Sequence, residues 1–81
     1  SYTGQSTTIL VRHYDRPGAI AAVTNFMAYS DVNIGNFRLS RQKKGGEAIM
    51  TIEIDGAATE RLPEQLKVLP HVISAIILKV I

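Results

Sequence analysis

A run of polar and turn-forming residues, HYDRPG at positions 13–18, offers the most distinctive chemistry in the chain. It follows a β-branched segment and precedes a stretch with helical spacing, so it should form a helix start, where free backbone N–H groups collect. Such groups attract an anion such as a carboxylate, while a neighbouring carboxylate or imidazole holds an ammonium or hydroxyl group. The arrangement suits a zwitterion such as an amino acid. The candidate binding residues are His13, Asp15, Arg16, Pro17, Gly18 and, further along the chain, Asn33.

Each of these residues also has an ordinary structural explanation. Asp15 suits a turn or a helix cap, and Pro17 with Gly18 marks a helix start. Asn33 tolerates a left-handed turn, and His13 is readily satisfied locally within a strand. The cations that follow are typical of the solvated face of a hairpin: Arg38, Arg41, Lys43 and Lys44.

Catalysis by the chain itself is not expected. A simple hydrolase needs a nucleophile beside a base, but the only histidines, His13 and His71, fall on different predicted elements, and there is no Cys. The two histidines also lack the clustered spacing of zinc ligands. The sequence therefore predicts a binding domain with no catalytic residues and no metal of its own.

The elements that would position these residues follow from changes in apolar spacing. Residues 7–14 (TTILVRHY) are β-branched and aromatic, which predicts a strand. A helix is expected over residues 18–30, where apolar residues recur three and four apart. Residues 34–42 and 47–55 alternate around the turn KKGG, which predicts an antiparallel hairpin.

The rest of the chain predicts a second helix and a last strand. Leucines spaced four and three apart from position 62 indicate a short helix, with Thr59 as its expected N-cap and Pro63 confined to its first turn. Residues 72–81 predict a strand that is apolar on both faces. The order βαββαβ is that of a ferredoxin-like α+β sandwich, a four-stranded antiparallel sheet in the order 4-1-3-2 with both helices on one face. Because the last strand would lie at an edge, we expect another subunit or domain to cover it.

Composition limits the chain to one small domain. With 81 residues it has a thin core, which favours an oligomer. The net charge of +2 is too small to attract nucleic acid or a membrane by its field alone, and no apolar run approaches a membrane span. We expect a flexible linker over residues 1–6, a domain over residues 7–81, and, because the start is polar, a cytoplasmic protein.

Two other functions of this fold class are disfavoured. RNA-binding modules stack bases on aromatic residues of the central strands, but the strands here offer only Tyr14 and Phe37 and lack the basic-Gly-aromatic run. Small acyl-phosphate hydrolases need a glycine-rich phosphate loop after the first strand, and that loop is missing.

The DRPG turn after a strand, followed by a helix and then VNI, resembles the ACT domain family of amino-acid sensors over nearly the whole of residues 7–81. This resemblance implies the ferredoxin-like fold and a regulatory amino-acid site. In the serine-sensing ACT domains of D-3-phosphoglycerate dehydrogenases, an HxNxPG motif and VNI form that site across two subunits. His13, Asp15 and Asn33 match those positions, although Asp15 replaces an Asn and would receive an ammonium group rather than a carboxylate.

The segments NIGNFRLSR and KGGEAIMTIEID are similar to the C-terminal part of the β subunits of iron–sulfur-dependent L-serine dehydratases. That resemblance implies a parent enzyme that deaminates L-serine at a 4Fe-4S cluster held elsewhere, with this domain as its regulatory part. L-serine would be the favoured ligand, and a second copy or the catalytic domain or subunit the partner. A purely structural dimerisation module that binds no ligand remains the alternative.

Overall fold

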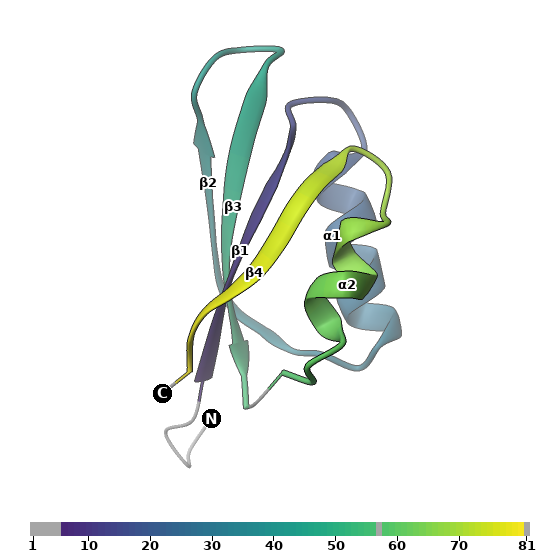
Figure 1. Ribbon diagram of the computed structural model, residues 1–81, viewed down its shortest axis with the longest axis vertical. Helices are drawn as coiled ribbons and strands as arrows, with labels where there is room; N and C mark the ends of the chain where they lie inside the picture. The colour runs from purple at the N-terminus through teal and green to yellow at the C-terminus, as the bar shows by residue number, and fades with distance from the viewer. Residues whose placement is uncertain (1–5, 57, 81) are drawn as a thin grey trace.

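The computed structural model describes residues 6–56 and 58–80, which form a four-stranded antiparallel sheet with two helices on one face (Figure 1). The elements are β1 (Ser6–Tyr14), α1 (Ala19–Tyr29), β2 (Ile34–Arg41), β3 (Glu47–Asp55), α2 (Leu62–Lys67) and β4 (Val72–Val80). The strand order β2-β3-β1-β4 confirms the predicted ferredoxin-like α+β sandwich. Of the predicted linker, residues 1–5 lie outside the described residues and Ser6 already belongs to β1; Ile81, the predicted end of the last strand, also lies outside them.

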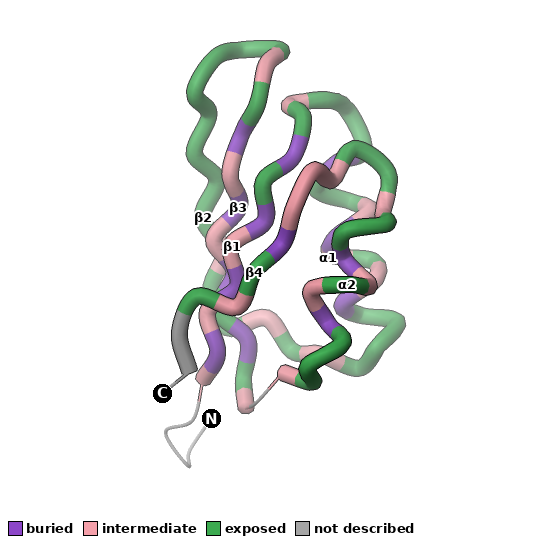
Figure 2. The backbone as a smooth tube through the Cα atoms, viewed as in Figure 1, coloured by how far each residue is buried: buried purple, intermediate pink, exposed green. Residues whose placement is uncertain are grey.

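The core lies between the two central strands and the helices. Alternate residues of β1 and β3 are buried, as the colours along these strands in Figure 2 show, because successive side chains of a strand point to opposite faces. The helices contribute residues at spacings of four, which share one helical face. The largest buried apolar side chains are Ile9, Val11, Val23, Met27, Met50, Ile52, Ile54 and Leu66.

Helix α1 has glycine before it and a left-handed residue after it. Gly18 is the N-cap with φ 90°, and a Cβ there would meet nothing within 4 Å, so glycine serves the backbone angle rather than space. At the other end Asp31 has φ 60°, with its N–H bonded to Ala28 O at 3.0 Å and the next N–H, of Val32, bonded to Met27 O at 2.8 Å. This pair of bonds needs a left-handed residue at Asp31. The interpretation of Asn33 as a left-handed position is therefore wrong.

Helix α2 begins later than its expected cap. The N-cap is Arg61, which makes no side-chain cap bond, and Pro63 lies in the first turn as predicted. Thr59 uses its backbone carbonyl to accept the Leu62 N–H at 3.1 Å. The prediction that Thr59 caps the helix is wrong because the chain makes a separate turn before the helix starts.

Strand β4 lies at one edge of the sheet and exposes apolar side chains. Ile76 is 51% exposed and Leu78 is 57% exposed, whereas Ala75 faces the core and is 8% exposed. Ile76 lies opposite Leu10 of β1, on the sheet face that the helices leave open. This confirms the prediction that the last strand is an edge strand with exposed apolar side chains; its covering by another chain stays a prediction. Neither described helix is long and apolar enough to cross a membrane.

Candidate functional site

The connection from β1 to α1 presents unpaired backbone donors. The Ala19 N–H bonds to Arg16 O at 3.1 Å and the Ala22 N–H bonds to Gly18 O at 2.9 Å. Between them, the N–H groups of Ile20 and Ala21 meet no backbone acceptor within the described residues. No acidic residue lies in the first turn and no side chain of the described residues caps it, so no carboxylate in this turn offsets the partial positive charge of the helix start.

Asp15 holds this turn against the β2–β3 hairpin. One carboxylate oxygen, Oδ2, accepts hydrogen bonds from Arg41 Nε at 2.9 Å and from the Gly45 N–H at 3.1 Å, and Arg41 Nη2 lies 2.9 Å from it. The backbone reinforces this contact, since the Asp15 N–H donates to Gly46 O at 2.7 Å. The Gly45 N–H, followed by the Arg41 guanidinium, lowers the pKa of Asp15. Asp15 is thus ionised at neutral pH, and its carboxylate links the β1–α1 connection to the β2–β3 hairpin.

His13 lies directly beneath the turn on the core side of β1. Its side chain is buried, and Nδ1 lies 2.9 Å from the carbonyl oxygen of Tyr14. Because a carbonyl only accepts, this contact places the proton on Nδ1 and leaves Nε2 as an acceptor. Nε2 is fully buried and has no hydrogen-bond partner within the described residues. The imidazole therefore carries an unsatisfied acceptor beside the candidate site.

Asn33 belongs to the other end of the sheet. Its Nδ2 donates to Asp55 Oδ2 at 2.6 Å, and the Asp55 N–H donates back to Asn33 O at 3.0 Å. The bond from Asn33 is the largest of the causes that lower the pKa of Asp55. Within one chain, Asn33 therefore orients the carboxylate at the end of β3.

One chain separates the predicted site residues into two groups. His13, Arg16 and their neighbours lie where β1 ends, whereas Asn33 lies beside Asp55, which pairs with Ser6 where β1 begins. The nine residues of β1 span about 27 Å at the usual rise per residue. In Figure 1 the β1–α1 connection and the start of β2 are at opposite ends of the sheet. A site that unites the two groups requires two chains.

Comparison with known proteins identifies the family. The family model described as "ACT domain" matches residues 7–71. The chain belongs to the ACT domain family. Its resemblance to these regulatory domains is thereby confirmed over most of its length.

Individual relatives extend this finding. This ACT domain is 37% identical over 71 residues to the "Probable L-serine dehydratase, beta chain" of Bacillus subtilis, covering 88% of this chain and 32% of that protein. It is 28% identical to the "D-3-phosphoglycerate dehydrogenase" of Methanocaldococcus jannaschii, over 89% of this chain and 14% of that one. The chain thus spans about a third or less of these curated relatives. In fold it matches the ACT domain of a GTP pyrophosphokinase from Chlorobium tepidum with a TM-score of 0.71, at 20% identity and covering 90% and 96% of the two chains.

Two features of this ACT domain were not predicted from the sequence. Arg41 was interpreted as part of a solvated hairpin face, but it pairs with Asp15, 26 positions earlier, and no local pattern indicates such a contact. A cavity of about 590 Å³ at the Asn33 end was also missed, because residues from several elements line it. Within the described part of the chain, no three His, Cys, Asp or Glu residues come together in a way that would hold a metal ion.

Proposed function

We propose that this ACT domain is the regulatory domain of an iron–sulfur-dependent L-serine dehydratase and binds L-serine, or a similar small amino acid, between two subunits. The relative that is 37% identical over 88% of this chain supports the serine dehydratase assignment. In such a parent, L-serine is converted to pyruvate and ammonia elsewhere. This chain contains no Cys, so thiolates of another part of the parent protein would hold the 4Fe-4S cluster.

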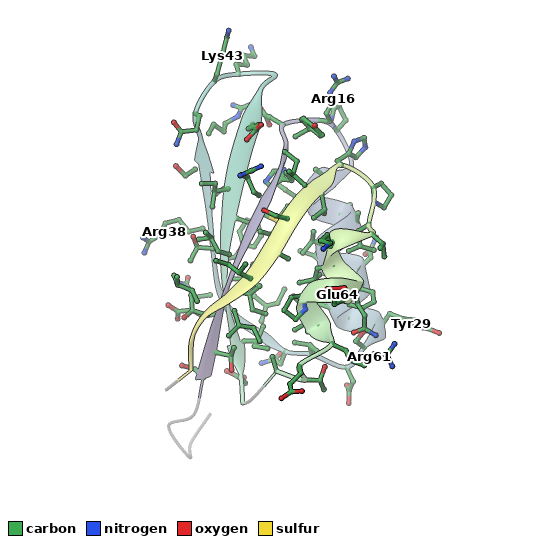
Figure 3. The ribbon with its side chains drawn as sticks, in the orientation of Figure 1. Arg16, Tyr29, Arg38, Lys43, Arg61 and Glu64 are labelled. Carbon is green, nitrogen blue, oxygen red and sulfur yellow. The ribbon has the colours of Figure 1, made fainter. Side chains whose placement is uncertain are left out.

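The uncapped start of α1 is the observation that carries the binding proposal. The N–H groups of Ile20 and Ala21, which meet no acceptor within the described residues, would receive the carboxylate of the amino acid. Arg16 is exposed at the same turn, where Figure 3 shows it extending away from the body of the domain. In the proposed site, His13 and Asp15 would add polar groups near the carboxylate, and Pro17 and Gly18 would shape the turn.

Charge complementarity supports a second copy as the neighbour that supplies Asn33. The β1–α1 and hairpin end carries Arg16, Lys43 and Lys44, none of which has a carboxylate partner within the described residues. The Asn33 end carries Asp31 and Asp55, so two copies related by a two-fold axis with their strands antiparallel would bring opposite charges together. The turn of one copy would then face Asn33 of the other.

Removal of single N–H donors tests this site without changing a side-chain contact. Ala21→Pro deletes one donor in the first helical turn, where proline is tolerated, and Ala21→Ser retains the donor as the matched control. In calorimetric titrations, L-serine should bind the wild type and Ala21→Ser alike, and Ala21→Pro about tenfold or more weakly. Asn33→Ala should also weaken binding, with the dimer verified by sedimentation. Absence of any amino-acid binding by a verified dimer would refute the proposal.

The exposed apolar residues of β4 support a second candidate, a structural dimerisation module that binds no ligand. Burial of Ile76 and Leu78 against another chain would stabilise a dimer by itself. This candidate predicts a dimer whose stability does not change when serine is added. A serine-sensing domain of a D-3-phosphoglycerate dehydrogenase, supported by the relative at 28% identity, predicts the same serine site on a different parent enzyme.

A further inference from the structure

We propose that Arg41 of the β2–β3 hairpin is a positioning residue of the ligand site, because it holds one oxygen of Asp15 and leaves the other for the ammonium group of the ligand. This inference rests on the proposed binding of L-serine at the β1–α1 connection. The hairpin and that connection lie at the same end of the sheet (Figure 1), although Arg41 is 26 positions after Asp15 in the chain. The inference therefore adds a residue from a distant segment to the site.

The side-chain contacts of Asp15 all fall on one of its two oxygens. Oδ2 meets Arg41 Nε and Nη2, each at 2.9 Å, and the Gly45 N–H at 3.1 Å. Oδ1 makes no hydrogen bond or ion pair with any described residue. Each carboxylate oxygen accepts up to two hydrogen bonds, so Oδ1 keeps its full capacity. The side chain is only 16% exposed, and an ammonium group bound there would be drawn partly out of water, which strengthens its attraction to the carboxylate.

The backbone of the hairpin fixes where Arg41 and Gly45 meet Asp15. The Asp15 N–H donates to Gly46 O at 2.7 Å, and the Gly46 N–H donates to Lys43 O at 2.9 Å, which closes the hairpin turn. Gly45 has φ 79°, a left-handed angle that glycine adopts without a Cβ penalty, and in this conformation its N–H reaches Asp15. The turn and the hairpin therefore form one bonded unit, in which the orientation of the Asp15 carboxylate is set by the hairpin.

Arg41 has the chemistry and the place to orient a carboxylate without cancelling its charge. It pairs with Ala48, which pairs with the buried His13, so the three lie in one row on the sheet face that carries the helices. Two nitrogens of its planar guanidinium meet the same oxygen, which restricts rotation of the carboxylate more than a single lysine ammonium would. The Arg41 side chain is half exposed, so water screens its charge. The carboxylate of Asp15 is therefore held in place and still attracts an ammonium group.

L-serine and 3-hydroxypropanoate, which is L-serine without its ammonium group, provide the test on a verified dimer. Arg41→Gln should weaken L-serine binding about tenfold and leave 3-hydroxypropanoate binding unchanged, because only L-serine uses Asp15. Arg12→Gln is the matched control. Arg12 is also half exposed and also joins β1 to the hairpin, through Glu47 at 3.3 Å, but it does not contact Asp15. Its substitution should change the affinity for neither ligand, and titrations followed by backbone amide shifts measure both affinities.

Two further measurements separate positioning from a loss of stability. L-serine, but not 3-hydroxypropanoate, should shift the carboxyl carbon resonance of Asp15 in the isotope-labelled chain. In Asp15→Asn, addition of Arg41→Gln should not change the ratio of the two affinities any further, because Arg41 acts only through Asp15. Unchanged or tighter L-serine binding by Arg41→Gln, or an equal loss for both ligands, would overturn the role of Arg41 and leave the serine site standing. Absence of L-serine binding to the wild-type dimer would refute the serine site, and the role of Arg41 with it.

Discussion

Replacement of His13 by leucine should stabilise the isolated domain while abolishing any role of the imidazole in binding. The buried Nε2 has no partner within the described residues, and an orphaned buried acceptor costs about 1–3 kcal/mol. The substitution also removes the bond from Nδ1 to Tyr14 O, worth about 0.5–1.5 kcal/mol. That carbonyl is not orphaned, because it also accepts the Arg16 N–H at 2.9 Å. The net expectation is a gain of about 1 kcal/mol in the free energy of unfolding.

Urea denaturation and thermal melting measure this gain. For a domain of this size, 1 kcal/mol corresponds to a rise in Tm of about 4–8 °C. His13→Gln is the matched control, because it keeps a buried polar group in the same position and should not give the gain. A loss of stability in His13→Leu as large as that in His13→Gln would show that Nε2 is satisfied in solution, and the reasoning from the orphaned acceptor would then fail.

Three further outcomes are expected. Asp31→Gly should raise the free energy of unfolding by about 1 kcal/mol in urea denaturation, because glycine adopts the left-handed conformation without a Cβ penalty; an unchanged midpoint would contradict this. Asp15 has a lowered pKa, so its stabilisation is present above its ordinary value of 3.8 and is lost as the pH falls through the lower folded value. Arg41→Gln should lower the free energy of unfolding at neutral pH and make its decline below about pH 4 shallower in acid denaturation. A curve parallel to that of the wild type would show that the ion pair between Asp15 and Arg41 does not stabilise the fold. Ile76→Asp should weaken self-association without unfolding the chain, as sedimentation over a range of concentrations would detect; an unchanged association constant would place the interface elsewhere.

The element order and topology could be predicted because their signals are local. Alternation in residues 47–55 gives β3 with the predicted bounds, and the turn KKGG lies where the hairpin reverses. The ends of helices were predicted less well. Thr59 has the right residue type for a cap, but the turn that its carbonyl closes places the helix start at Leu62. Residue preferences alone do not choose between two adjacent turns.

The sequence predicted which residues lie near the start of the helix, but it did not predict their hydrogen-bond partners. The sequence places Asp15 beside α1, but its hydrogen-bond partners come from Arg41 and Gly45, which folding brings from the far side of a hairpin. The same limit applies to Asn33, whose partner Asp55 is 22 positions later. Contacts over such separations form only when the strands pair, and no local pattern in the sequence indicates them.

The separation of the two groups along β1 has a thermodynamic consequence for the proposed regulation. If L-serine contacts the turn of one chain and Asn33 of another, the dimer binds it more tightly than the monomer does. Linkage then requires serine to strengthen dimerisation, by a factor that the two affinities fix. In such an equilibrium, burial of the exposed β4 residues Ile76 and Leu78 would stabilise the dimer relative to the monomer. Under this proposal, association of the ACT domains would be the step by which amino-acid binding affects the catalytic part of the parent protein. No group in this chain would need to take part in the reaction itself.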